Sequence, residues 1–88
     1  MKIEVSKLFE KDILALKDKS LASKLEILIN KLEFVHSLSK VFGVKKMEGH
    51  NNYFRVRLGN YRLGMKIEND KILLLRFMHR KDIYRVFP

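Results

Sequence analysis

The first third of the chain carries apolar residues at helical spacing after a short alternating segment. Residues Lys2 to Ser6 alternate polar and apolar side chains, which is typical of a short strand, and Ser6 is placed to cap a helix that begins at Lys7. The first helical stripe consists of Leu8, Phe9, Ile13 and Leu16. After a break at Lys17 to Ser20, a second stripe is formed by Leu21, Leu25, Leu28 and Leu32. The pattern predicts a strand followed by an αα-hairpin.

From Val41 onward, apolar residues recur at every second position, which indicates β-strands. Turn-forming residues at 49–52, 59–60 and 69–70 divide this pattern. The predicted strands are Val44 to Met47, Tyr53 to Leu58, Tyr61 to Ile67 and Lys71 to Met78. Because no linker or repeat interrupts the chain, we expect residues 1–88 to form one α+β domain. In it, the N-terminal strand and the αα-hairpin pack on one face of a mainly antiparallel, twisted sheet of four to five strands.

The hairpin around Gly59-Asn60 sorts its side chains onto two faces. If these two residues form the loop, Arg57 lies opposite Arg62 and Arg55 lies opposite Gly64. One face is then apolar and suits the helices: Phe54, Val56, Leu58, Tyr61, Leu63, Met65 and Ile67. The other face carries Tyr53, Arg55, Arg57, Arg62 and Lys66. Like charges directly opposite each other destabilise a sheet, so the arrangement predicts an anion bound between Arg57 and Arg62.

The alternative is that these arginines decorate a solvated face and pair with acids elsewhere. Residues 49–67 contain no Asp or Glu, which weakens that alternative. Gly64 leaves a gap opposite Arg55, and the gap either admits a phosphate or base or marks a β-bulge.

The register, continued across the turn at 69–70, sets Phe77 opposite Arg62. The arginine face is then predicted to hold Leu73, Leu75, Phe77 and His79 as well. Phe77 is there either a stacking platform for a base or a core residue. The same register puts Arg76 on the helix side, which only a bulge or a position at the sheet edge explains.

The charge of the chain is concentrated in its second half. Residues 1–44 hold eight lysines against six acids, whereas residues 45–88 hold eleven lysines and arginines against four acids, within a net charge of +9. All six arginines lie in the second half, and their planar guanidinium groups suit bidentate phosphate contacts. We therefore expect a polyanionic partner, RNA above all.

Other classes of site and location are disfavoured by composition. The chain has no cysteine, and its three histidines are too dispersed for a local zinc motif, so we expect neither a metal nor another cofactor. It contains no apolar run of signal-peptide or membrane-spanning length, which predicts a cytoplasmic protein without membrane contact.

The C-terminal segment adds groups that can take part in acid–base chemistry. RNA cleavage by its own 2′-hydroxyl needs a base for that oxygen, cations for the phosphorane and an acid for the leaving 5′-oxygen. His79 is a candidate base and Tyr84 a candidate acid, with structural roles as the alternative for both. In the same segment, Ile83, Val86 and Phe87 are spaced to dock a short terminal element.

Three sequence segments resemble the RelE/ParE toxin superfamily, and its RelE branch most closely. They are KMEG at 46–49, YFRVRLGNYRL at 53–63 and HRKDIY at 79–84, and the resemblance spans about residues 40–88. In order and spacing they are similar to the family's turn, basic strand, Gly-Asp/Asn-Tyr-Arg hairpin and terminal His-Arg-X-X-X-Tyr.

The resemblance implies an RNase-like fold and a toxin of a type II toxin–antitoxin system. RelE-like members are ribosome-dependent endoribonucleases that cut mRNA in the A site and are neutralised by an acidic, RelB-like antitoxin, with a heterotetramer as one form of the complex. By position, the implied catalytic residues are Arg62, Arg80, Tyr84 and His79, and the implied RNA-binding residues are Lys45, Lys46, Arg55, Arg57 and Phe77.

Two departures from the family pattern bear on the mechanism. The basic pair Arg55 and Arg57 stands where the best-known members have lysine, and the spacing from Arg80 to Tyr84 is that of a shorter subgroup. Arginine is a poor general base because of its high pKa, so His79 stays in contention. The alternative functions are a ParE-like inhibitor of DNA gyrase, a non-catalytic RNA-binding protein or inactivated toxin, and a partner protein whose basic face serves only the antitoxin contact.

Overall fold

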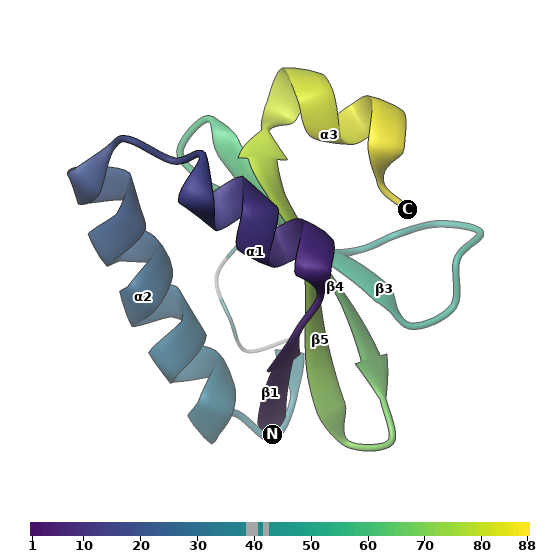
Figure 1. The fold of residues 1–88 in the computed structure, drawn as a ribbon. Coiled ribbons are helices and arrows are strands. Elements are labelled where there is room, and N and C mark those ends of the chain that lie inside the picture. Colours follow the sequence, from purple (N-terminus) through teal and green to yellow (C-terminus); the bar gives the residue numbers. More distant parts are fainter. Residues whose placement is uncertain (39–40, 42) are drawn as a thin grey trace.

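The computed structural model describes residues 1–38, 41 and 43–88, so Lys40, where the family resemblance begins, lies outside the described residues. Eight elements follow one another along the chain (Figure 1): β1 (Lys2–Val5), α1 (Lys7–Leu14), α2 (Lys19–Phe34), β2 (Val44–Lys46), β3 (Tyr53–Leu58), β4 (Tyr61–Glu68), β5 (Lys71–His79) and α3 (Arg80–Val86). The predicted strands and the helix pair are confirmed. Helix α3 was expected only as a short terminal element.

Local capping explains where the helices begin. The Ser6 hydroxyl accepts a hydrogen bond from the Phe9 N–H at 3.1 Å, as predicted for a cap before Lys7. The Asp18 carboxylate accepts one from the Leu21 N–H at 3.0 Å, so α2 begins at Lys19, inside the break expected at Lys17 to Ser20.

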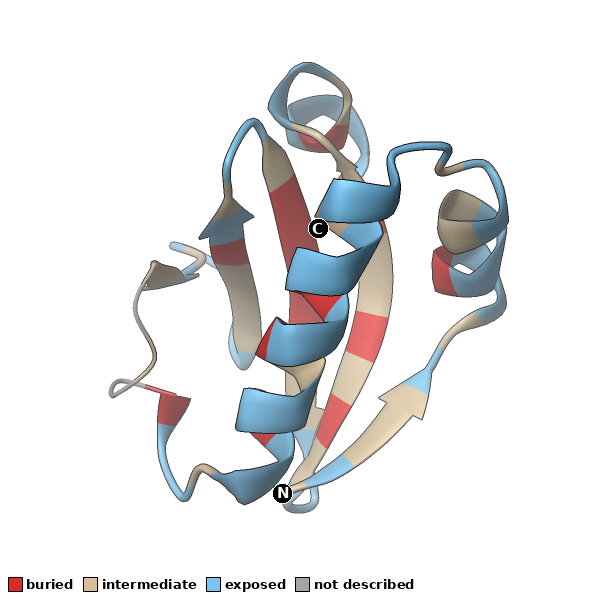
Figure 2. Cartoon of the chain, turned by 90° about the vertical axis from the view of Figure 1, so that its left-hand side faces the viewer, coloured by how far each residue is buried: buried red, intermediate tan, exposed pale blue. Residues whose placement is uncertain are grey.

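The five strands form one mixed sheet in the order β1-β5-β4-β3-β2. Strand β1 is parallel to β5, and the other neighbours are antiparallel. Helices α1 and α2 pack on one face, as expected, and Figure 2 shows buried positions on the sheet behind α2. The core between them consists of Phe9, Leu25, Leu28, Leu32, Leu38, Val56, Leu63, Met65, Ile72, Leu74 and Phe77. Within the described residues, no helix is long and apolar enough to cross a membrane.

The predicted register of the β3–β4 hairpin is confirmed. Arg57 lies opposite Arg62 and Arg55 lies opposite Gly64. Gly59, at φ +60°, takes the left-handed conformation that the two-residue turn requires. The face that carries Arg55 and Arg62 is therefore the one turned away from α1 and α2.

The register predicted for β4 and β5 is wrong beyond Met65. Met65 pairs with Leu74 but Gly64 pairs with Arg76, so Leu75 is an extra, bulged residue on β5. Side chains after a one-residue bulge change faces, and Phe77 therefore pairs with Leu63 in the core, where it is 2% exposed. His79 pairs with Tyr61 on that same face, while Arg76 moves to the arginine face.

Asp12 of α1 closes the edge of β5 where β1 ends. Its carboxylate accepts hydrogen bonds from the Phe77 N–H at 2.9 Å and from the Arg76 guanidinium at 2.9 and 3.1 Å. An unpaired strand edge exposes backbone N–H groups that need acceptors. The Asp12 carboxylate is the acceptor for the Phe77 N–H, and it also compensates the charge of Arg76.

Helix α3 packs on the opposite face of the sheet from α2. Its Ile83 is fully buried, and Phe87, the residue after the helix, is 7% exposed. The Phe87 ring fills the gap at Gly64, where a Cβ would lie 2.8 Å from ring carbons, and meets the Tyr53 ring edge to face. The predicted gap therefore coincides with a bulge and is occupied by the protein itself. Val86, expected to dock as well, is 49% exposed.

We expect Gly64→Ala to destabilise the protein by about 2 kcal/mol, because the new methyl group overlaps the Phe87 ring. Urea denaturation measures the loss, and hydrogen exchange of the α3 amides reports whether the helix loosens. In a Phe87→Ala background the same change should cost less than half as much. Equal costs in both backgrounds would contradict the proposed contact.

Candidate active site

Helix α3, strands β2 to β4 and the residue before β2 enclose a pocket of about 270 Å³ on the arginine face. The described residues that line it are Gly43, Val44, Lys45, Arg55, Arg57, Arg62 and Tyr84. Five residues predicted from the sequence thus share one small cavity, although they come from positions 45 to 84. Of the described lining residues, none is an acid or a histidine.

Arg62 is the buried cation of this pocket, with 9% of its surface exposed. Its Nη1 donates hydrogen bonds to the carbonyl oxygens of Gly59 and Tyr61, both at 2.9 Å. These acceptors are neutral, and no Asp or Glu of the described chain forms an ion pair with Arg62. A buried cation held only by carbonyl groups retains most of its charge for an anion that enters the pocket.

Two pairs of like charges stand directly opposite each other on the strands that line the pocket. Lys45 faces Arg55 across β2 and β3, and Arg57 faces Arg62 across β3 and β4. Four ion pairs of the described residues lie outside the pocket: Lys66–Glu68, Lys71–Glu4, Arg76–Asp12 and Arg85–Asp82. A polyanion bound in the pocket would relieve the repulsion within both of these pairs.

Tyr84 brings α3 into the site. The Arg55 guanidinium carbon lies 4.6 Å from the centre of the Tyr84 ring, and the side chain remains 54% exposed. Arg80 lies one helical turn earlier, is exposed, and its N–H donates to the Asn60 carbonyl at 2.8 Å. The turn that holds Arg62 thus also holds the start of α3, which couples the positions of Arg62 and Tyr84.

Four of the site residues predicted from the sequence do not line the pocket, and Arg80 is one of them. His79 caps α3, where its Nδ1 accepts the Lys81 N–H at 3.1 Å, and its ring packs edge to face on Tyr61. Phe77 is in the core. Lys46 pairs with Phe54, so alternation places it on the face opposite Lys45.

Two features of the site were not predicted: the part played by Gly43, and the contact of Phe87, which was expected to dock the terminal element, with Gly64. The Gly43 carbonyl accepts the Arg57 N–H at 3.1 Å, and a Cβ on Gly43 would lie 3.3 Å from the Arg57 carbonyl oxygen. Phe87 seats α3 on Gly64. The position of Gly43 just before a predicted strand was a signal for its role. Nothing in the neighbouring sequence indicates the contact between Phe87 and Gly64.

The chain is similar to known toxins over its whole length. The sequence model of the family described as "ParE toxin of type II toxin-antitoxin system, parDE" matches residues 3–84. Toxin RelE3 of Methanocaldococcus jannaschii is 35% identical over 89 residues, which cover 100% of both chains.

Two solved structures have the same fold. A chain of the RelB-RelE antitoxin-toxin complex from Methanococcus jannaschii superposes with a TM-score of 0.82 at 33% identity, covering 97% of this chain and 99% of that one. A chain of the archaeal RelE-RelB complex from Pyrococcus horikoshii gives 0.75 at 24% identity, over 92% and 96% of the two chains, which shows a likeness of fold. The fold and family predicted from the sequence are confirmed, and this chain belongs to the RelE/ParE superfamily of type II toxin–antitoxin toxins.

Proposed function

We propose that this toxin is an endoribonuclease that cleaves mRNA in the ribosomal A site and so inhibits translation. One observation carries the proposal: among the described residues, the buried Arg62 has no acidic ion-pair partner, and the other charged residues that line its pocket are all cations. Such a pocket suits the phosphate of an RNA backbone. Its relationship to Toxin RelE3 supports the same reading.

The proposed reaction is attack of the 2′-oxygen on the adjacent phosphorus. The 2′-hydroxyl gives up its proton, an O–P bond forms, the bond from phosphorus to the 5′-oxygen breaks, and the 5′-oxygen takes up a proton. The products are a 2′,3′-cyclic phosphate and a 5′-hydroxyl end. Negative charge accumulates on the phosphorane, which is where preorganised cations contribute most to the rate.

The geometry suggests a division of roles. Arg62, rigid and buried, contacts the phosphorane, while Lys45, Arg55 and Arg57 hold the flanking backbone. Tyr84 donates the proton to the leaving 5′-oxygen, because its exposed phenol lines the pocket. His79 is left out of the chemistry, since capping α3 occupies its Nδ1. With no described lining group suited to act as a strong base, the site depends on positioning by the ribosome.

We also propose that an acidic antitoxin neutralises this chain in the cytoplasm. Two of the similar structures are antitoxin–toxin complexes, and the excess of cations in residues 45–88 suits an acidic partner. A short acidic protein encoded in the neighbouring reading frame is the expected partner.

The test is a reconstituted translation reaction with a defined mRNA, in which primer extension maps the cuts. We expect cuts in phase with the codons that disappear when ribosomes are omitted. A parallel supercoiling assay with DNA gyrase tests the ParE-like alternative. Gyrase inhibition with intact mRNA would overturn the proposal, and inactivity in both assays would favour an inactivated toxin.

Tyr84→Phe is expected to lower kcat about 100-fold, because it removes the proposed proton donor but keeps the ring beneath Arg55. KM should stay within about twofold, since the stacked ring remains. Tyr53→Phe is the matched control: it removes a phenol on the same face of the sheet but outside the pocket. Wild-type kcat in Tyr84→Phe, with a loss only in Tyr84→Ala, would restrict Tyr84 to positioning Arg55.

A further inference from the structure

Helix α3 is held on the sheet at both of its ends. At its start, the Arg80 N–H donates a hydrogen bond to the Asn60 carbonyl at 2.8 Å. At its end, the ring of Phe87 packs into the gap above Gly64. Tyr84 lies between these two contacts, so its position over the pocket depends on both of them.

Gly64 lies in the middle of a row of three residues on the arginine face. Arg55 is its partner on β3 and Arg76 is its partner on β5. Partners on neighbouring strands have adjacent side chains, so a side chain on Gly64 would lie between the two arginines. The ring of Phe87 occupies that place instead. Because this ring comes from the end of α3, it ties the helix to the strand position directly beside Arg55.

Tyr84 and Phe87 are neighbours in the last turn of α3. They are three residues apart, and the Phe87 N–H still donates to the Ile83 carbonyl at 2.9 Å. Phe87 is 7% exposed and is fixed by packing, whereas Tyr84 is 54% exposed and rests on the Arg55 guanidinium, 4.6 Å from the ring centre. The buried ring therefore sets the place of the exposed one.

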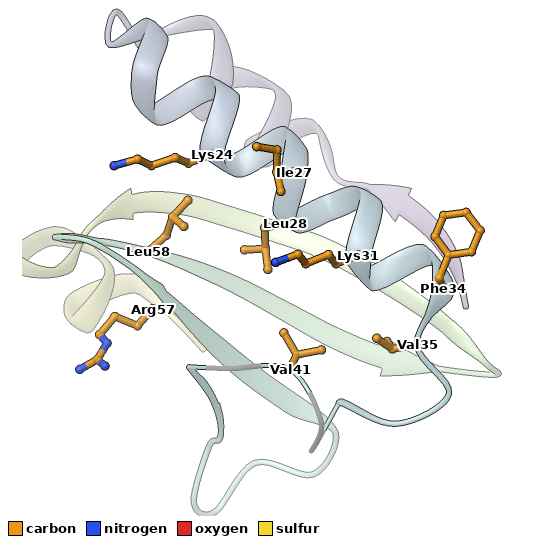
Figure 3. Close-up of a pocket in the computed structure, with 9 residues that line it drawn as sticks. All are labelled: Lys24, Ile27, Leu28, Lys31, Phe34, Val35, Val41, Arg57 and Leu58. Atoms are coloured by element: carbon orange, nitrogen blue, oxygen red, sulfur yellow. The ribbon is translucent and has the colours of Figure 1, made fainter.

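The other face of the sheet does not act on the charged groups of the pocket in this way. A larger cavity of about 700 Å³ separates α2 from β3 there, and Arg57 is the described residue that lines both cavities. Figure 3 shows that the Arg57 guanidinium points away from the larger cavity. The charged end of Arg57 is thus turned away from α2, whereas α3 places an aromatic ring on Arg55.

We propose that Phe87 is a positioning residue for RNA cleavage: packed in the Gly64 gap, it holds Tyr84 where the phenol reaches the leaving 5′-oxygen. This inference rests on the proposed function, in which Tyr84 is the proton donor. In that step the bond from phosphorus to the 5′-oxygen breaks and the phenol proton moves to this oxygen, which leaves a phenolate that takes up a proton from water. A misplacement of about 1 Å slows such a step about 100-fold, so the packing of Phe87 controls kcat.

The test combines Phe87→Ala with Tyr84→Phe in mRNA cleavage on programmed ribosomes. Phe87→Ala alone is expected to lower kcat about 30-fold and to change KM by no more than about twofold, because a misplaced phenol is felt mainly in the transition state. In the Tyr84→Phe background the phenol is already absent, so Phe87→Ala should lower kcat by less than about threefold further.

Two further variants control for the fold. Val86→Ala is the matched control, since Val86 is 49% exposed, precedes Phe87 and does not line the pocket, so kcat should stay within about twofold. Phe87→Leu keeps an apolar group in the gap and should lower kcat only about fivefold. Thermal unfolding verifies that each variant is folded at the assay temperature, and Phe87→Leu carries the test if Phe87→Ala is not.

A second measurement does not depend on cleavage. In the free protein, nuclear Overhauser effects between the Tyr84 ring and the Arg55 side chain should be present in the wild type and in Val86→Ala but lost in Phe87→Ala. Their retention in Phe87→Ala would overturn the proposal.

The kinetic outcomes separate this inference from the proposed function. Wild-type kcat in a folded Phe87 variant would overturn the inference alone. Equal losses of kcat from Phe87→Ala in the two backgrounds would do the same, because Phe87 would then act independently of the Tyr84 phenol. A wild-type chain that cuts no mRNA would refute the proposed function and, with it, the catalytic consequence of the Phe87 contact.

Discussion

Arg62→Lys is expected to lower kcat for mRNA cleavage about 10³-fold, although it keeps the positive charge. One nitrogen of the Arg62 guanidinium, Nη1, donates hydrogen bonds to the Gly59 and Tyr61 carbonyls. The other two nitrogens are the proposed donors to the substrate. An ammonium group has one nitrogen, so it cannot hold both carbonyls and also present a planar pair of donors to the phosphorane. Single-turnover cleavage on programmed ribosomes measures the effect.

Arg85→Lys provides the matched control. Arg85 is exposed and paired with Asp82 on α3, outside the pocket, so its replacement should leave kcat within about twofold. Thermal unfolding verifies that Arg62→Lys remains folded at the assay temperature. Near-wild-type cleavage by a folded Arg62→Lys variant would remove Arg62 from the proposed mechanism.

Asp12→Ala is expected to lower the free energy of unfolding by about 3 kcal/mol. The substitution leaves the Phe77 N–H and the Arg76 guanidinium without their acceptor, in a place where the two ion-paired side chains are 11% and 20% exposed. The hydrogen bonds that Arg76 donates to the Asp12 carboxylate raise the pKa of Arg76 against the opposing effect of burial. Since Arg76 stays protonated below its ordinary pKa, this stabilisation is present at neutral and moderately alkaline pH.

Asp82→Ala breaks the corresponding exposed pair with Arg85 and should cost no more than about 0.5 kcal/mol. Asp12→Asn should fall between the two, because its amide oxygen still accepts the Phe77 N–H while the ion pair is lost. Urea denaturation provides all three values. Equal losses for Asp12→Ala and Asp82→Ala would mean that Asp12 does not close the edge of β5.

Most of the basic pocket was predictable because its residues lie on one hairpin. The turn at Gly59-Asn60 fixes the register, and alternation then puts Arg55, Arg57 and Arg62 on one face without reference to the rest of the fold. Tyr84 could be named from the residues as a candidate acid, with a structural role as the alternative, and the family resemblance supported the catalytic role. Its place beneath Arg55 depends on α3, which reaches the sheet through contacts far apart in sequence.

The errors in the predicted faces of β5 follow from one residue. Leu75 bulges out of β5, and from there on the side chains occupy the opposite faces to those predicted. Phe77 therefore joins the core, His79 leaves the arginine face and Arg76 enters it. Alternating apolar residues do not reveal a bulge when both faces accept hydrophobic side chains, as they do here under α2 and under α3.

The sequence by itself determined the strands, the helix pair, the hairpin register and the gathering of cations, because periodicity, caps and two-residue turns act over a few neighbouring residues. Only the tertiary structure decided which residues complete the pocket. Phe87 packs against Gly64 and so holds α3, which carries Tyr84, on the sheet, and Asp12 closes the edge of β5. Each of these depends on the packing of segments 20 or more residues apart, which no local pattern encodes.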